Sequence, residues 1–309
     1  MQENMSITHE PRTAAGQEPI GCLAAVVVVY NQEFSKSCAH RSISAMAQAH
    51  PGKLKHVFVY DNSRSRCSPP EESLPSLGIS IHERHDPQNG GLVPAYNWAS
   101  QRATELGCDW ILLIDQDATL PPDYLKVFSS SAGTFHQDVV AAIPHVRAGG
   151  KRIAPQGTLA GLTLPWPLPK DAVGPQATEV VGINSGTFVR LTYLAMRGGW
   201  DSRYSLDAVD FWFFAEVYAN RKLVAILPCE IAHALSVADL STISLRRYES
   251  VVRAEREFYL HMRPRRTQFL ASQMMFARAA KNLLTGRLSL ARIGAREAAL
   301  MFSRGLRRR

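Results

Sequence analysis

The chain has 309 residues, of which 46% are hydrophobic and 20% are charged. This composition is typical of a globular protein with one large domain, or one domain plus an extension, that can bury a core without disulfides. The five cysteines are scattered, odd in number and form no Cys-x-x-Cys pair. They argue against a disulfide framework or a zinc ribbon and favour a reducing cytoplasm.

No stretch approaches the roughly 18 consecutive apolar residues that a membrane-spanning helix needs. Residues 1–20 are polar and contain no apolar core of a secretory signal. We therefore expect a disordered leader over 1–20 and a cytoplasmic protein, with the inner face of the plasma membrane as a second location.

The net charge of +8 is unevenly distributed. Residues 246–309 contain 16 Lys and Arg against four Glu, so the rest of the chain is mildly acidic. We divide the chain into the leader, a main domain over 21–240 and a basic helical extension over 241–309. A basic extension suits an anionic membrane surface. Nucleic acid is a weaker candidate, because no recognised nucleic-acid-binding fold or alternation of aromatic and basic residues accompanies the charge.

The chain alternates apolar runs with helical patterns over its first 125 residues. The runs LAAVVVVYN, KHVFVYDNS, ISIHERH and DWILLID predict strands, and helices are expected over 35–49 and 92–107. Further along, the pattern predicts a strand over 139–149, a short strand near 180, a helix from 192, a helix over 207–219 and a strand over 222–228. Strands that alternate with helices predict an α/β fold with a mainly parallel central sheet flanked by helices.

Polar residues follow several of these strands. Tyr30-Asn31, Asp61-Asn62 and the Asp115-Gln116-Asp117 triplet each stand where an apolar run ends. In an open α/β sheet, ligands bind beyond the carboxyl ends of the strands. We therefore expect these groups to converge on one site.

Asp115 and Asp117 pose an electrostatic problem. Side chains at i and i+2 of an extended segment point the same way, so two like charges would repel. A hard divalent cation relieves this repulsion, and Mg²⁺ commonly binds carboxylates together with phosphates of a substrate. Taken alone, the motif is also compatible with a solvated turn or a helix cap.

The segments VVVYN, VYDNS, NGGLVPAYN and LLIDQD, in this order and spacing, resemble family 2 glycosyltransferases of the GT-A fold. INSGTFVRL, GGWDSRYSLDAVDFW and AHALS are similar to the rhamnosyltransferase-like branch of that family. The resemblance covers about residues 22–260. It implies a metal-dependent, inverting transfer of a sugar, L-rhamnose from dTDP-rhamnose or another dTDP- or UDP-hexose, to a cell-surface polysaccharide or lipid-linked glycan.

The resemblance also assigns roles to individual residues. Asp115, Asp117 and His233 would bind Mg²⁺ or Mn²⁺. The donor would be bound by Tyr30, Asn31, Asp61, Asn89, Gly90, Gly91, Asn97, Gln116, Asn184, Ser185 and Gly186, with Asp61 accepting a hydrogen bond from the base. Ordinary turns would explain Asp61, the NGG segment and the INSG segment equally simply, and packing would explain His233.

The catalytic base would lie in LDAVD. Asp210 is the better match and Asp207 the second candidate, and their i, i+3 spacing would put both on one face of a helix. Alternatively, one of them caps that helix.

The chain departs from the branch after these acids. Phe211 to Phe214 follow, where the branch carries an acidic residue, and Glu216 occupies the place of an arginine. This run predicts either a different acceptor pocket or a degenerate protein that binds a nucleotide sugar or glycan without turnover.

A membrane scaffold defined by the basic extension is a third hypothesis. For the extension itself, packing on the main domain is the simpler alternative to membrane contact.

Overall fold

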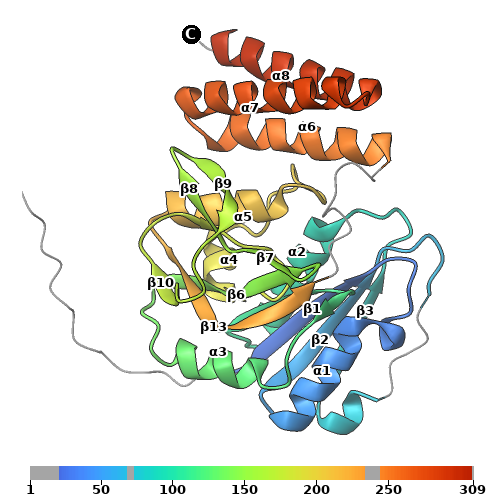
Figure 1. The fold of residues 1–309 in the computed structure, drawn as a ribbon. Coiled ribbons are helices and arrows are strands. Elements are labelled where there is room, and N and C mark those ends of the chain that lie inside the picture. Colours follow the sequence, from blue (N-terminus) through green and yellow to red (C-terminus); the bar gives the residue numbers. More distant parts are fainter. Residues whose placement is uncertain (1–20, 68–72, 234–243, 308–309) are drawn as a thin grey trace, which may run out of the picture.

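The computed structural model describes residues 21–67, 73–233 and 244–307 (Figure 1). The predicted leader and residues 234–236 of the AHALS segment lie outside these ranges. Within them, no helix is long and apolar enough to span a membrane.

A mixed sheet forms the centre of the protein, and its strands run in the order β10-β13-β6-β12-β4-β1-β2-β3. These strands are β1 Leu23–Val29, β2 Leu54–Asp61, β3 Ser80–His85, β4 Trp110–Asp115, β6 Val139–Ala148, β10 Gly174–Gln176, β12 Phe188–Arg190 and β13 Leu223–His233. The pairs β1–β2, β1–β4, β2–β3 and β6–β13 are parallel, whereas β12 is antiparallel to β4 and β6. The mainly parallel α/β sheet that the sequence predicts is thus confirmed.

Helices cover both faces of this sheet. The helices of the main domain are α1 Cys38–Ala49, α2 Leu92–Glu105, α3 Tyr124–Ala132, α4 Leu191–Arg197 and α5 Val209–Ala219. Alternate residues of β1 enter two separate cores: Ala24, Val26 and Val28 pack with α2, α4 and α5, and the intervening residues pack with α1 and α3. The valine-rich run is buried on both faces because each face carries a helical layer.

The carboxyl ends of the parallel strands come together at one edge. Val29 of β1 pairs with Asp61 of β2, and Val28 pairs with Asp115 of β4. This register places the polar residues that follow β1, β2 and β4 in one row, as the sequence predicts.

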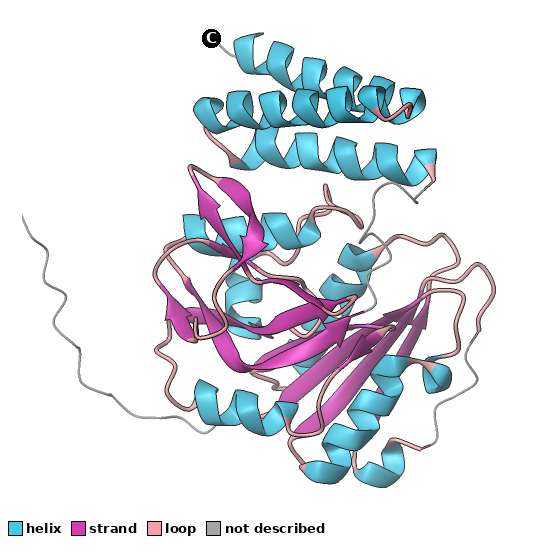
Figure 2. Ribbon diagram, viewed as in Figure 1, coloured by secondary structure: helices cyan, strands magenta, loops and turns pink. Residues whose placement is uncertain are grey.

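Two further units lie over this edge. A small sheet contains β8 Gln156–Leu159, β9 Leu162–Pro167 and β11 Val180–Val181. The basic C-terminal segment forms a bundle of α6 Leu245–Met262, α7 Arg265–Leu284 and α8 Leu288–Arg307, which stack together (Figures 1 and 2). The short elements that complete the fold are β5 Ala118–Thr119, β7 Lys151–Ala154 and the 3-10 turns Phe34–Lys36 and Pro75–Leu77.

The bundle is continuous with the main domain. Tyr248, Val252 and Phe258 of α6 are buried in the same core as the helix α5. The buried Glu179 ion-pairs with Arg263, at the end of α6, and accepts a hydrogen bond from Thr158 of β8 at 3.1 Å. The extension therefore packs on the protein, as the simpler alternative to membrane contact supposed.

Two helix boundaries differ from the prediction. The helix expected over 35–49 begins at Cys38, because the Ser37 hydroxyl accepts a hydrogen bond from the His40 amide and caps it. The helix expected over 207–219 begins at Val209, because Ala208 adopts a left-handed φ of 60°. The prediction that Asp207 and Asp210 share a helical face is therefore wrong.

The Glu179–Arg263 pair gives a test of how firmly the bundle is attached. Glu179→Ala leaves the buried Arg263 without its partner, so we expect the free energy of unfolding to fall by about 3–5 kcal/mol. Urea unfolding of both proteins measures the difference. Glu105→Ala, which breaks an exposed pair with Arg102, should cost less than about 1 kcal/mol. Equal losses of unfolding free energy in the two variants would contradict the view that the Glu179–Arg263 pair attaches the bundle firmly.

Candidate active site

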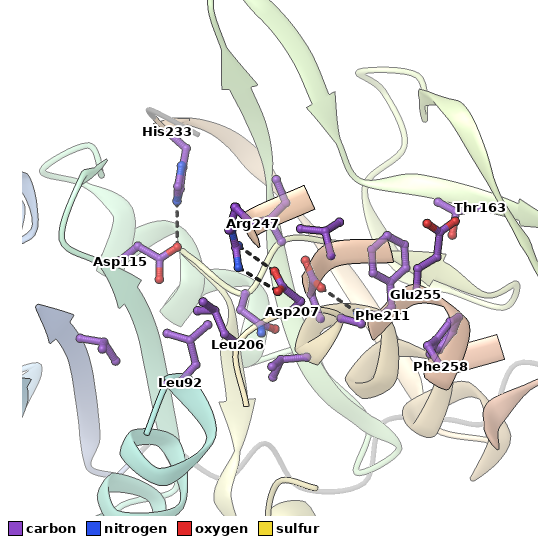
Figure 3. A pocket seen from close by; sticks show the side chains of 18 of the residues that line it. Leu92, Asp115, Thr163, Leu206, Asp207, Phe211, His233, Arg247, Glu255 and Phe258 are labelled. Carbon is purple, nitrogen blue, oxygen red and sulfur yellow. Dashed lines mark hydrogen bonds and ion pairs between the residues drawn. The ribbon is translucent and has the colours of Figure 1, made fainter. Parts of the chain in front are cut away.

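A cavity of about 900 Å³ lies where the strand ends, the small sheet and the bundle meet. Figure 3 shows side chains from all three units pointing toward it. Its polar lining includes Asp115, Asp117, Asp207, Asp210 and His233, together with Arg247 from α6. Five donor-site residues predicted from sequence also line it: Tyr30, Asn89, Gly91, Gln116 and Asn184.

Two acids and a histidine form a cluster at one side of the cavity. His233 Nε2 lies 2.9 Å from Asp115 Oδ2 (Figure 3). It lies 3.7 Å from Asp117 Oδ1. Antiparallel pairing of His233 with Ala118 of β5 carries the imidazole to the acids. On the other side, the Ser185 hydroxyl accepts a hydrogen bond from the Asp115 amide at 2.9 Å and helps to hold the end of β4.

The charges of this cluster perturb one another. Burial raises the pKa of Asp117; His233 opposes this rise, and the neighbouring charge of Asp115 adds to it. Burial opposes a charge on His233, but its hydrogen bond to Asp115 and the charges of both acids raise its pKa overall. The cluster thus attracts positive charge, which a proton on the imidazole supplies in part.

The cluster has the donor atoms that a divalent cation needs. One ligand atom from each of Asp115, Asp117 and His233 lies within 4.8 Å of the others. Two carboxylate oxygens and one imidazole nitrogen suit Mg²⁺ or Mn²⁺, with positions left for phosphate and water oxygens. The residues present therefore fit the metal that the sequence predicts.

Asp210 and Asp207 line the same cavity but have different surroundings. Burial raises the pKa of Asp210 to about 6, although hydrogen bonds from the amides of Phe211 and Asp210 oppose the rise; the charges of Asp115 and Asp207 add to it. Asp207 is instead bound by one guanidinium and one hydroxyl group: Arg247 donates to both of its oxygens, at 2.7 and 2.8 Å, and Ser250 donates at 2.6 Å. Neither acid caps α5, whose N-cap residue is Ala208.

The remaining predicted donor residues lie around the cavity rather than on its surface. Asp61 is 4% exposed, and its carboxylate accepts hydrogen bonds from the amides of Ser63 and Cys67. The Asn97 side chain accepts a hydrogen bond from the Trp200 amide at 2.7 Å and donates one to the Trp200 carbonyl at 3.0 Å. The residues absent from the cavity lining are Asn31, Asp61, Gly90, Asn97, Ser185 and Gly186.

Gly91 shows what the NGG segment does locally. Its φ is +90°, and a Cβ there would lie 2.3 Å from the Ser205 carbonyl oxygen. That same oxygen accepts a hydrogen bond from the Leu92 amide at 2.7 Å, at the first turn of α2. Glycine is thus required where the loop before α5 crosses the start of α2.

The aromatic run after Asp210 is mostly structural. Trp212, Phe213 and Phe214 are buried, and Phe213 stacks on Trp200 with ring centroids 4.8 Å apart. Only Phe211 of the four lines the cavity, where it contacts Phe258 of α6. Glu216, in the place of the family's arginine, ion-pairs with Arg197.

Several cavity residues escaped the sequence reasoning. They are Gln156, Thr163, Leu164, Arg247, Glu255, Phe258, Tyr259, Met274 and Arg278. These residues come from the small sheet and the bundle, and no motif marks them. Asn62, which the sequence places at a strand end, also lines the cavity as expected.

The raised pKa of Asp210 predicts an unusual dependence of stability on pH. A carboxyl group with a higher pKa in the folded state binds more protons there than in the unfolded chain between about pH 4 and 6, so stability falls as pH rises through that window. We expect Asp210→Asn to be more stable than the wild type at pH 7 by about 1–3 kcal/mol, and to lose this advantage at pH 4. Urea unfolding across this range measures it.

Asp201 provides the matched control, because its hydrogen bonds and ion pair with Arg203 outweigh burial and lower its pKa. Asp201→Asn should therefore be less stable than the wild type at pH 7, with the loss shrinking as pH falls. If the stabilities of the wild type and Asp210→Asn changed in parallel with pH, the raised pKa of Asp210 would be contradicted.

Comparisons with known proteins identify the family and the fold. A model of the family described as "Glycosyl transferase family 2" matches residues 24–192, more than half of the chain. Among solved structures, S. aureus TarS 1–349 matches with a TM-score of 0.50 and 16% identity, covering 78% of this chain and 66% of that one. The same fragment in complex with UDP gives the same values.

The chain thus spans about two thirds of the TarS fragment, and at this identity the likeness concerns the fold alone. No curated protein sequence matches the chain. The family model includes β1 to β4 and the Asp115-Gln116-Asp117 segment. This chain belongs to glycosyl transferase family 2.

Proposed function

We propose that the protein is a metal-dependent, inverting glycosyltransferase that uses a nucleoside diphosphate sugar. The observation that carries the proposal is the cluster of Asp115, Asp117 and His233 on the wall of the same cavity as Asp210. Family membership supports the reaction type. TarS, which shares the fold, is described in complex with UDP, which supports a nucleoside diphosphate as the leaving group.

The acidic cluster would hold Mg²⁺ or Mn²⁺ and so place it against the diphosphate. When bound, this metal would neutralise the negative charge that develops on the leaving diphosphate. Tyr30, Asn62, Asn89 and Asn184 line the cavity near the strand ends and would contact the rest of the donor.

Asp210 would act as the general base. In an inverting transfer, an acceptor hydroxyl oxygen forms a bond to the anomeric carbon while the bond to the diphosphate oxygen breaks. The hydroxyl proton passes to a carboxylate, and a pKa of about 6 leaves Asp210 ionised at neutral pH yet basic enough to take it. Asp207 is held by Arg247 and Ser250, so we assign it a positioning role.

The bundle would form the acceptor side of the cavity. Phe258 and Tyr259 of α6 present ring surface there, and Glu255 ion-pairs with Arg278 of α7. Aromatic surface beside paired charges suits a sugar, whose apolar faces stack and whose hydroxyls form hydrogen bonds. The acceptor is proposed to be a glycan, carried on a lipid or belonging to a cell-surface polysaccharide.

We propose dTDP-L-rhamnose as the donor, from the resemblance of the INSG and LDAVD segments to the rhamnosyltransferase-like branch. Another dTDP- or UDP-hexose is the nearest alternative. A degenerate protein that binds without turnover is less well supported, because three of the four aromatic residues that suggested it are buried in the core.

Binding of dTDP and UDP, each with and without Mn²⁺, tests the proposal by calorimetry. We expect Mn²⁺-dependent binding to the wild type, weakened at least about 100-fold in Asp117→Asn because a ligand to the metal is lost. Asp123→Asn, an exposed acid nearby, should bind as the wild type does. Absence of nucleotide binding to the folded wild type would overturn the assignment.

Asp210→Asn serves as a further arm of this experiment. It should keep nucleotide affinity within a few-fold and lose at least about 100-fold in turnover of donor with acceptor. Full turnover in this variant would exclude Asp210 as the base. Binding without turnover in the wild type would favour the degenerate protein.

We further propose that the turn between α7 and α8 contacts an anionic membrane. Leu283, Leu284 and Leu288 are exposed there, Leu284 by 87%, and Lys281 and Arg287 flank them. Exposed apolar side chains beside basic ones suit the boundary of an anionic bilayer. A lipid-linked acceptor would reach the cavity from that surface.

Co-sedimentation with vesicles that contain phosphatidylserine tests this contact. Leu284→Asp combined with Leu288→Asp should reduce the bound fraction several-fold, because two apolar contacts are replaced by charges of the wrong sign. Met196→Asp, at a 72% exposed position on α4, should bind as the wild type does. Equal reductions in both variants would contradict a specific contact.

A further inference from the structure

A second cluster of atoms that could bind a metal lies at the amino ends of the parallel strands, whereas the cavity lies at their carboxyl ends. Cys22 precedes β1, Cys108 precedes β4, and His56 belongs to β2. Because β1 lies between β2 and β4, the three residues stand side by side at the amino ends of these strands. One ligand atom from each lies within 4.8 Å of the others, and the two sulfur atoms are 2.7 Å apart.

The backbone holds both cysteines in place. The Asp109 carboxylate accepts hydrogen bonds from the amides of Gly21 and Cys22, at 2.8 and 3.2 Å. The Cys108 amide donates to the Ala103 carbonyl at 2.9 Å, after a left-handed Gly107 ends α2. Both thiols are therefore presented by ordered turns that are anchored to the sheet.

The histidine of the cluster has a hydrogen-bond partner on the neighbouring strand. His56 Nδ1 lies 3.2 Å from His82 Nε2 of β3, so a metal in this cluster would be bound through the other ring nitrogen of His56. His82 is itself fixed by stacking on Phe58, with ring centroids 4.6 Å apart. A hydrogen bond to the second nitrogen of a ligand histidine orients the ring and sets its tautomer.

We propose that Cys22, Cys108 and His56 form a Zn²⁺ site, with solvent as the fourth ligand and His82 as a positioning residue. Two thiolates and one imidazole are ligands typical of zinc, and no carboxylate belongs to the set. Zn–S bonds of about 2.3 Å in tetrahedral geometry place two sulfur atoms about 3.8 Å apart. Cys22, half-buried at the start of β1, would move by about 1 Å on binding, and each thiol would release its proton.

A disulfide is the competing explanation of two such close sulfur atoms. It would join Cys22 to Cys108 with loss of two electrons and two protons to an external oxidant, and it would give His56 and His82 no role. The convergence of a third ligand atom and its hydrogen-bonded neighbour therefore favours the metal.

Titration of the chelator-treated, reduced full chain with Co²⁺ distinguishes this site from the acidic cluster. Thiolate ligands give an intense thiolate-to-cobalt charge-transfer absorption, which a site made of two carboxylates and an imidazole lacks. We expect this absorption in the wild type, with displacement by Zn²⁺, and its loss in Cys22→Ser. Cys38→Ser, which alters a half-buried cysteine elsewhere, should retain it.

The histidines give the second arm. His56→Ala should weaken Co²⁺ binding at least about 100-fold, and His82→Ala by about 10–100-fold, both read in the same absorption band. Circular dichroism confirms that each variant is folded. An absent band in the wild type, or a band that survives in folded Cys22→Ser, would overturn the proposal. So would a Cys22–Cys108 disulfide found by peptide mass mapping of zinc-free protein purified without reductant.

Discussion

Repulsion between Asp115 and Asp117 is the constraint on which the arrangement of the site depends. The two carboxylates follow a strand whose apolar residues are buried on both faces, so the chain cannot move them apart without disturbing the core. Positive charge must come to them instead. His233 arrives from β13, far along the chain, and β5 pairs with that strand next to the acids. The raised pKa of His233 reflects its hydrogen bond to Asp115 and the negative charges of Asp115 and Asp117.

A second set of contacts separates two acids that look alike in sequence. Asp207 is bound by Arg247 and Ser250 of α6, whereas burial raises the pKa of Asp210. The difference originates in the bundle, since α6 supplies both partners of Asp207. The bundle is thus a part of the site and not only a basic appendage. Its attachment through Glu179 and Arg263 helps to hold this wall of the cavity on the main domain.

Local patterns in the sequence predicted what depends on local rules. The valine-rich strand, the strand-end acids and the convergence of Tyr30, Asp115 and Asp117 follow from periodicity and from the topology of parallel sheets. The start of α5 could not be predicted, because it is set by the left-handed Ala208 beside a tertiary ion pair. Arg247, Glu255 and Arg278 were missed for the same reason: a charged residue in a basic helix has no local sign that it faces a cavity. The aromatic run was over-interpreted, since nothing in the sequence separates the buried Trp212 and Phe213 from the cavity-lining Phe211.

The origin of the cavity wall in α6 and α7 has a consequence for the order in which the protein matures. A ribosome that has completed β13 has already made the acids, His233 and the whole sheet that presents them. Arg247, Glu255 and Arg278 emerge only afterwards. The part of the cavity at the strand ends is therefore synthesised before the wall that α6 and α7 contribute. Before the bundle is made, the site would be open to solvent on the side of that wall. The helices of the bundle then complete both the fold and the pocket.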